Sequence, residues 1–241
     1  MSEAASTSPV QRDVLVWDLP TRLFHWSLVA LIVVAWFTGE EDGGAAVVHR
    51  IAGETVAGLI VFRLAWGFLG GQHARFADFA AGPTAIVNHL RDLFSTTPKR
   101  HLGHNPLGGL AVFLLLANVA VIALTGLFSS GDENVGPFAG MWGLELSEVH
   151  EVAFRVLQAL VVVHIFGVIA ESWKAKDGLV PAMITGRKKR GASEPADDAA
   201  RASLRALIIA VALGLIVTGA LVIQPPATGA FSEEHERDLD D

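Results

Sequence analysis

The stretch HEVAFRVLQALVVVHIFGV, residues 150–168, decides the fold of this chain. It is apolar over the length of a buried helix, yet it carries His150 at its start and His164 near its end. At about 100° per residue, the fourteen steps between them return the helix to within about 40° of its starting direction. A rise of about 1.5 Å per residue separates the two rings by roughly 21 Å along the axis. The stretch therefore predicts a helix that presents two histidines on one face, at two depths.

Apolar runs of similar length recur along the chain. About 20 apolar residues cross a hydrocarbon core ~30 Å thick, whereas each helix of a soluble bundle keeps a polar stripe. The third and fifth runs have no charge beyond Arg205 at an edge, and 51% of all residues are hydrophobic, which excludes a soluble bundle. We expect an all-α integral membrane protein with five spans, at roughly Leu23–Gly39, Val47–Leu69, Leu107–Phe128, Val149–Trp173 and Leu204–Ile223.

Cysteine and tyrosine are both absent from the sequence. Without cysteine the chain has no disulfides, no thiolate-held iron–sulfur cluster and no C-x-x-C-H attachment of c-type haem. The sequence also lacks the G-x-S-x-G, P-loop and H-E-x-x-H motifs, which argues against a hydrolase or an NTPase. Chemistry inside the membrane therefore falls to other polar side chains, and the histidines are the strongest candidates.

Charged residues are distributed unevenly between the two sides of the five spans. Lysine and arginine gather before the first span, between the second and third, and between the fourth and fifth. Carboxylates gather after the first span, between the third and fourth, and in the tail. By the positive-inside rule the N-terminus is cytoplasmic, and the C-terminus is periplasmic in the inner membrane of a bacterium. Five spans also require termini on opposite faces, so the two arguments agree.

Four of the nine histidines lie within the spans or at their ends, and they sort by depth into two pairs. His49 and His150 lie near the periplasmic face, and His25 and His164 lie nearer the cytoplasmic face. Haem iron takes two axial imidazoles in a large apolar slot, so this arrangement predicts two bis-histidine haem sites stacked across the membrane. The remaining histidines are interpreted as loop or tail residues: His73, His89, His101, His104 and His235.

Other interpretations of the four intramembrane histidines stay open. A histidine in a membrane helix is often a hydrogen-bonded packing residue, and a pair can serve as a proton relay or as half of a zinc site. A relay or a hard-metal site needs carboxylates in mid-span, whereas Glu54 and Glu151 lie near the ends of their spans. The two depth-matched pairs therefore favour haem.

Arginines and small residues near the histidines give a second indication of haem. Haem propionates are anionic and need cationic partners near each membrane surface. Snorkelling to lipid phosphate is the alternative for such arginines, above all for Arg22 and Arg50. Gly53, Ala153 and Gly167 leave room for a porphyrin, although small residues also pack membrane helices together. The candidate propionate partners are Arg22, Arg50, Arg63 and Arg155.

Five segments of the chain resemble the bacterial cytochrome b561 family, which is grouped with the b-type cytochrome subunits of nickel–iron hydrogenases. The segments are VWDLPTRLFHW, HRIAGETVAGLIVFRLAWGF, GHNPLGG, HEVAFRVLQALVVVHIFGV and MITGRKK, and they cover roughly residues 14–190. The resemblance implies a four-helix transmembrane bundle that holds two non-covalently bound haem b groups. It also implies electron transfer between the membrane quinone pool and a redox partner. The ligands that it implies are His25, His49, His150 and His164.

The resemblance and the charge pattern together divide the chain into five parts. The fifth span and the acidic tail lie outside the common core of the family. We expect a disordered cytoplasmic N-terminus at 1–13, a four-helix di-haem cytochrome b domain at 14–186, a charged cytoplasmic linker at 187–203, the fifth transmembrane helix at 204–223 and an acidic periplasmic tail at 224–241.

The favoured hypothesis is electron transfer across the inner membrane between quinone or quinol and a redox partner. The end of the tail, EEHERDLDD, could steer a periplasmic c-type cytochrome by its charge, or it could be a solvated tail. Asp18 and Arg22 are polar candidates for a quinone contact or for an interfacial anchor.

Two further hypotheses for the function remain. One is a haem-containing membrane anchor or electron-transfer subunit of a hydrogenase or other dehydrogenase complex, and the other is a haem-free proton or ion pathway. Membrane lipid is an expected partner, and nucleic acid is not.

Overall fold

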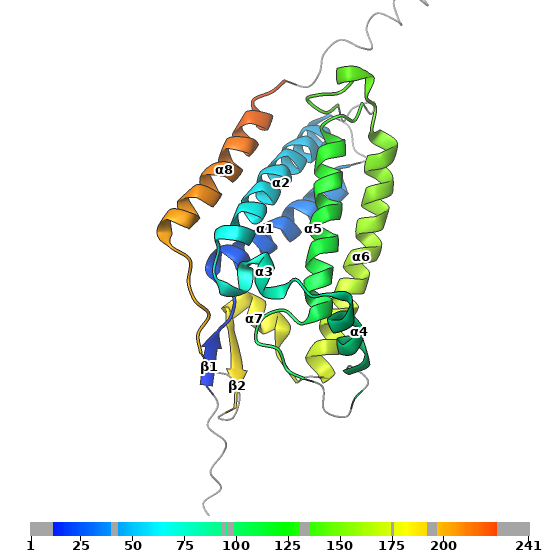
Figure 1. Ribbon diagram of the computed structural model, residues 1–241. Helices are drawn as coiled ribbons and strands as arrows, with labels where there is room; N and C mark the ends of the chain where they lie inside the picture. Colours follow the sequence, from blue (N-terminus) through cyan, green and yellow to red (C-terminus); the bar gives the residue numbers. More distant parts are fainter. Residues whose placement is uncertain are drawn as a thin grey trace, which may run out of the picture. The chain divides into compact units, whose positions relative to one another are not determined.

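The computed structural model describes residues 12–39, 43–92, 95, 99–130, 135–174, 176–191 and 197–225. Over these residues the chain is mostly helical, and five of its helices are long and apolar enough to cross a membrane (Figure 1). They are α1 (Leu19–Thr38), α2 (Gly44–Leu69), α5 (Pro106–Gly126), α6 (Ser147–Lys174) and α8 (Leu204–Val222). The prediction of an all-α membrane protein with five spans is confirmed.

Short elements connect the long helices and precede the first of them. Two short strands pair antiparallel as β1 (Arg12–Leu15) and β2 (Arg187–Arg190). The other short elements are the 3-10 turns η1 (Gln72–Ala74) and η2 (Met141–Gly143) and the helices α3 (Phe76–Phe79), α4 (Pro83–Asp92) and α7 (Leu179–Thr185).

Two of the long helices begin at side-chain caps that the sequence supplies. The Asp18 carboxylate accepts a hydrogen bond of 2.9 Å from the Thr21 amide at the start of α1. The Asn105 side chain accepts one of 2.6 Å from the Gly108 amide, and Pro106 occupies the first position of α5. Such caps satisfy amides that have no partner within the helix, and proline at the first position has no amide to satisfy.

The described contacts divide the chain into two compact units, each made of three segments. Unit 1 comprises residues 1–23, 66–113 and 162–207, and unit 2 comprises residues 24–65, 114–161 and 208–241. In unit 1 a small apolar core forms around Val16, Trp17 and Ala182. Gly186 ends α7 in the left-handed region at φ 84°, where a Cβ atom would lie 2.7 Å from the Trp17 carbonyl oxygen, so the turn requires glycine.

Both short strands include residues that were expected in the N-terminal segment or in the charged linker. Arg12 and Asp13 belong to β1, and residues 187–190 form β2 rather than part of a linker. The segment around Ala199 also contacts unit 1, because the Ala199 amide donates a hydrogen bond of 2.9 Å to the Leu15 carbonyl oxygen. Within RKKR, residues 187–190, Lys188 and Arg190 are buried and form ion pairs with Asp177 in unit 1. Residues 1–11, 192–196 and 226–241 lie outside the described part of the chain.

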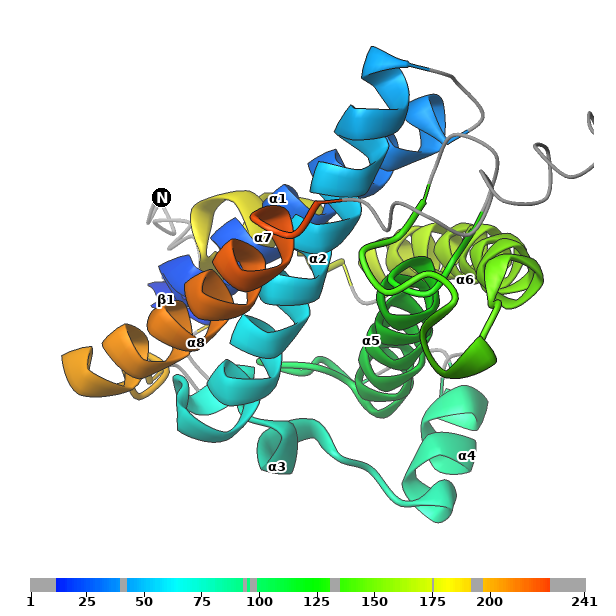
Figure 2. The same ribbon diagram turned by 90° about the horizontal axis from the view of Figure 1, so that it is seen from above.

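Unit 2 holds an apolar core built from three of the long helices. Its buried residues are Val56 and Ile60 of α2, Val119 and Ala123 of α5, and Leu157 of α6. The fifth long helix, α8, lies beside α2 (Figure 2). The two backbones approach closely at a pair of glycines, since a Cβ atom on Gly58 would lie 2.6 Å from the carbonyl oxygen of Gly214. Close approach through small residues is how helices associate where lipid removes the hydrophobic driving force.

Candidate functional site

His49 and His150 come together within unit 2, as their depth in the sequence predicted. The ring centroids lie 6.2 Å apart, with His49 on α2 and His150 on α6. Two imidazole nitrogens bound at about 2.0 Å on opposite sides of one metal ion would place their ring centroids roughly 6 Å apart. The pair therefore has a spacing that suits axial ligands of a single ion.

Hydrogen bonds fix the orientation of both rings. His49 Nδ1 lies 2.9 Å from the Ala35 carbonyl oxygen, and His150 Nδ1 lies 2.9 Å from the Ile122 carbonyl oxygen. A carbonyl oxygen only accepts, so in each ring Nδ1 carries the proton and donates it. The lone pair of each Nε2 is then available to a metal ion, which is the arrangement found around metal-bound histidines.

Two glycines make room for the rings. A Cβ atom on Gly39, just beyond α1, would lie 3.3 Å from His49 Cε1. One on Gly126, at the end of α5, would lie 3.0 Å from His150 Cε1. Sequence reasoning missed both residues, because each lies far from its histidine along the chain and only the packing of the helices brings them together.

The two histidines line a cavity of about 830 Å³ in unit 2. Its walls come from α1, α2, α5 and α6, and they include apolar side chains such as Val56, Val119 and Leu157. Gly53 also lines the cavity, and a Cβ atom there would meet no other atom within 4 Å, so the space beside it is open. A large, mainly apolar cavity lined by two histidines suits a planar organic cofactor.

The donor set fits haem better than an ion held by the protein alone. Among the described residues, no group of three or more histidine, cysteine, aspartate or glutamate side chains could hold a metal ion. A zinc site needs three or four protein ligands, whereas porphyrin supplies four nitrogens and leaves two axial positions to the protein. The pair His49 and His150, beside an open cavity, provides those two positions.

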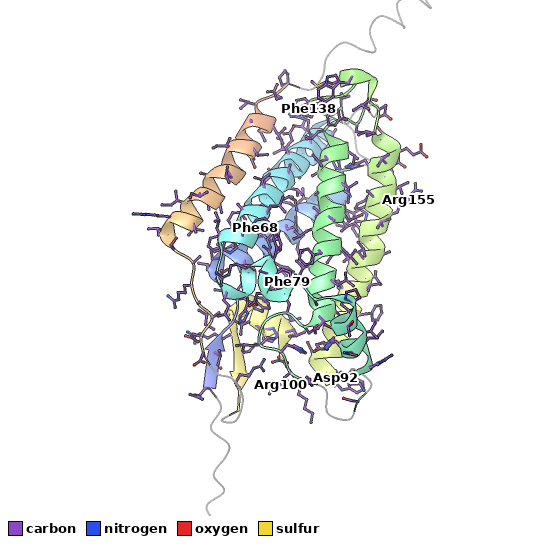
Figure 3. The ribbon with its side chains drawn as sticks, in the orientation of Figure 1. Phe68, Phe79, Asp92, Arg100, Phe138 and Arg155 are labelled. Carbon is purple, nitrogen blue, oxygen red and sulfur yellow. The ribbon has the colours of Figure 1, made fainter. Side chains whose placement is uncertain are left out.

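The arginines predicted to bind propionates lie in different surroundings. Arg50 and Arg155 line the cavity, and each forms an ion pair one helical turn away, with Glu54 at 2.9 Å and with Glu151 at 3.2 Å. The side chain of Arg155 is 73% exposed and points outward from α6 (Figure 3). These two residues can reach the rim of the cavity.

The other two candidate arginines do not line this cavity. In unit 1 Arg22 donates to the Ile184 carbonyl oxygen of α7 at 2.5 Å. Arg63 of α2 is buried in unit 2. The backbone carbonyl oxygen of Ala153 accepts a hydrogen bond from the Asn118 side chain at 3.0 Å, which links α5 to α6.

His25 and His164 are placed in different units. His25 of α1 belongs to unit 2 and packs against the neighbouring Trp26, with ring centroids 4.9 Å apart. His164 of α6 belongs to unit 1. Their pairing stays a prediction. Gly167, three residues after His164, has no atom within 4 Å of a Cβ built on it.

The loop between η2 and α6 fixes the position of the helix that carries His150. The Glu145 carboxylate accepts hydrogen bonds from the Ser147 hydroxyl at 2.5 Å and from the Ser130 amide at 3.1 Å. The bond from Ser147 is the main reason that the pKa of Glu145 falls to about 2. Glu145 is therefore ionised at neutral pH and holds the first turn of α6 against the segment that follows α5.

Sequence reasoning also missed two buried histidines of unit 1, which it had interpreted as loop residues. His73 lies 2.7 Å from Asp78, and His89 lies 3.7 Å from Glu171. The first partner follows five residues later and could have been suspected from the sequence. The second is 82 residues away in sequence, and no local pattern indicates it.

Comparisons with known proteins add to this geometry. A sequence model of the family described as prokaryotic cytochrome b561 matches residues 16–186, which include α1, α2, α5, α6 and the four candidate ligand histidines. The chain is also similar to proteins named probable Ni/Fe-hydrogenase B-type cytochrome subunit. The one from Rhizobium leguminosarum bv. viciae is 25% identical over 215 residues, which cover 74% of this chain and 90% of that protein. The one from Azotobacter vinelandii is 27% identical over 214 residues, with 73% and 88% covered. No solved structure matches the chain.

Proposed function

This chain belongs to the prokaryotic cytochrome b561 family, and on that premise we propose that it carries electrons through two haem b groups between a hydrogenase and the membrane quinone pool. Family and fold make it a multi-pass membrane protein that binds haem b and transfers electrons. The number of haems, the two redox partners and the orientation in the inner membrane belong to the proposal.

The observation that carries the proposal is the pair His49 and His150, which line a large, mainly apolar cavity and whose Nδ1 atoms donate to carbonyl oxygens, so that Nε2 remains available. When bound there, haem b supplies a one-electron carrier. The Ala35 and Ile122 carbonyl oxygens keep both rings in position and strengthen them as donors, since they accept the Nδ1 protons. Arg50 and Arg155 line the cavity and would supply positive charge near the propionates.

His25 and His164 are proposed as ligands of the second haem. His164 lies fourteen residues after His150 on the same helix, so the two point to one face of α6 at different depths. His25 lies on α1 and matches the family segment VWDLPTRLFHW. Haems at two depths give electrons a path from one side of the membrane to the other.

A hydrogenase is the redox partner that the relatives' names support, since those proteins are named Ni/Fe-hydrogenase B-type cytochrome subunits. Dihydrogen oxidation by the partner would deliver electrons to the haems, and quinone would accept them. A periplasmic c-type cytochrome is the second candidate, and it rests on the acidic end of the tail. The charge distribution supports a cytoplasmic N-terminus and a periplasmic C-terminus in the inner membrane.

Purification from haem-sufficient cells tests the proposal directly. We expect two low-spin b haems per chain, both of them reduced by a quinol analogue, and reduction by dihydrogen when the hydrogenase is co-purified. A preparation without haem would refute electron transfer, and one haem per chain would refute the second site. Haems that dihydrogen leaves oxidised in the presence of the hydrogenase would refute that partner.

A further inference from the structure

Four described histidines of unit 1 outside the proposed haem sites have a buried ring nitrogen: His73, His89, His101 and His104. His73 Nε2, His89 Nε2 and His101 Nδ1 are buried, and among the described residues they have no hydrogen-bond partner. His73 and His89 are 7% and 5% exposed. A buried nitrogen without a partner destabilises the fold unless water or a transferred proton satisfies it. Three of them in one unit call for a functional explanation.

His101 and His89 are neighbours, and Asp78 connects His73 to the same region of unit 1. The Asp78 carboxylate lies 2.7 Å from His73 Nδ1 and is 28% exposed, so it reaches solvent. Asp78 and His101 line a cavity of about 150 Å³, large enough for several waters at ~30 Å³ each. The rings of His101 and His89 lie 5.1 Å apart, and His89 Nε2 lies 3.7 Å from Glu171.

Glu171, the last of these titratable groups, lies on α6, the helix that carries His164. Glu171 follows His164 by seven residues in α6, and both belong to unit 1. Seven residues are nearly two turns, so the two side chains lie on one face, roughly 10 Å apart along the axis. The Glu171 carboxylate is buried, and it accepts a hydrogen bond from the side chain of Asn105.

The charged groups around the histidines suit the passage of protons. Burial is the main cause that lowers the pKa of His89, and the Asp92 carboxylate partly opposes it. Burial also lowers the pKa of His101, which is surrounded by His89, Glu171 and Lys188. Both rings are therefore neutral at pH 7 and can accept a proton and release it. Lys188 and Arg190 donate to the His101 carbonyl oxygen at 3.1 and 2.8 Å, which fixes its backbone.

We propose that Asp78, His101, His89 and Glu171 form a proton relay that takes protons from the aqueous side of unit 1 to quinone reduced beside His164. His73 acts at the outer end of the relay, where its hydrogen bond orients Asp78. The relay rests on the proposed function. Quinone becomes quinol by taking two electrons, which arrive through the haems, and two protons, which the relay supplies from water. No redox change occurs in the relay itself, because each member returns to its starting state after it passes a proton on.

The test uses the complete haem-loaded protein in phospholipid vesicles. The haems are first reduced with dithionite, and the excess is removed because dithionite would reduce quinone directly. A soluble quinone is then added as the acceptor, and its reduction is followed as re-oxidation of the haems. The variants Glu171→Gln and His89→Gln keep the size and polarity of the side chains but transfer no proton. Asp13→Asn is the control: it removes an exposed carboxylate of β1 that belongs to unit 1 but lies outside the relay. Haem content, haem spectrum and the rate of haem reduction by dithionite are measured for every variant.

We expect Glu171→Gln and His89→Gln to lower the quinone reduction rate at pH 7 on the order of 10²-fold, as for lost general acid–base transfer. The solvent deuterium isotope effect on that rate should rise, and a small weak acid in the buffer should restore the rate, while Asp13→Asn behaves as wild type. Normal rates and isotope effects in both variants, at full haem content, would overturn the relay.

A further variant keeps the test possible if one of the glutamine variants does not fold. If either glutamine variant fails to fold, His101→Asn is measured in the same way with the same two outcomes. A haem-loaded wild-type protein that reduces no quinone would refute the proposed quinone partner, and the relay with it. That result is distinguishable from failure of the relay alone, in which wild type and variants reduce quinone equally fast.

Discussion

At the scale of single residues, each imidazole of the site in unit 2 is held between a carbonyl oxygen and a glycine. Ala35 and Gly39 flank His49, and Ile122 and Gly126 flank His150. The carbonyl oxygen sets which nitrogen faces the cavity, and the glycine lets the ring approach the backbone of the next helix. The orientation of the two imidazoles therefore depends on residues that are not themselves ligands.

Replacement of Gly126 by valine tests this dependence. A Cβ atom at residue 126 would lie 3.0 Å from His150 Cε1, and valine adds two methyl groups beyond it, so the ring must turn away. We expect haem affinity at this site to fall by roughly 10- to 100-fold, as for other changes behind a metal ligand. Haem content and the low-spin spectrum of the purified protein measure the effect.

The control for this variant is Gly219→Val in α8, where a Cβ atom meets nothing within 4 Å. It adds the same side chain to a membrane helix and should leave the haem content unchanged. Equal haem content in both variants would show that Gly126 does not support His150.

At the scale of elements, β2 is held by one buried carboxylate. Asp177 lies 3.2 Å from Lys188 and 3.1 Å from Arg190, which are 4% and 3% exposed, and 3.3 Å from Arg100. Burial opposes ionisation of Asp177, but the hydrogen bond from Arg190 and the charge of Lys188 outweigh it, so its pKa is lowered. The carboxylate thus allows two cations of the strand to be buried.

Asp177→Asn should therefore weaken unit 1. Loss of one partner from a buried ion cluster costs about 3–5 kcal/mol, because the remaining charges stay buried without compensation. The wild type should show the same loss at acid pH. With a lowered pKa, the contribution of Asp177 is complete above its ordinary pKa near 3.8 and disappears as the pH falls below it.

Denaturation in detergent at pH 7 and along an acid titration measures both effects. Asp13→Asn, an exposed change in β1, is the control and should behave as wild type. An Asp177→Asn protein of wild-type stability would show that the cluster does not hold β2.

The sequence could predict helices but not β2 or its partners. The five spans follow from apolar runs, and the starts of α1 and α5 follow from Asp18–Pro20 and Asn105–Pro106, because both signals are local. The partner of Lys188 and Arg190 lies more than ten residues earlier, beyond the end of α6, and the strand pairs with residues near the N-terminus. Contacts at such separations depend on tertiary folding, which local patterns do not encode.

At the scale of the whole molecule, the four candidate ligands come from three helices. α1 carries His25, α2 carries His49, and α6 carries His150 and His164. The sequence predicted the meeting of His49 and His150 because depth in a membrane restricts the possible partners of a side chain. It could not predict the relay of unit 1, where His89 and Glu171 meet through folding of the segment between α2 and α5.

Replacement of His164 by alanine tests the assignment at this scale. We expect the variant to lose one haem and to keep the haem of His49 and His150, because the two sites share no ligand. Haem content per chain and a spectroscopic redox titration measure this, with His235→Ala as the control that keeps both haems. Loss of both haems, or of neither, would contradict the pairing of His25 with His164.

The continuity of α6 has a consequence for how this chain can vary in length. His150, His164 and Glu171 are separated by multiples of seven residues on one uninterrupted helix. A single inserted or deleted residue between His150 and His164 would turn everything beyond it by about 100°. Both the second haem and the inner end of the relay would then face lipid or another helix. Insertions and deletions should therefore preserve function in the connecting segments but abolish it within residues 150–171, whatever amino acid is inserted.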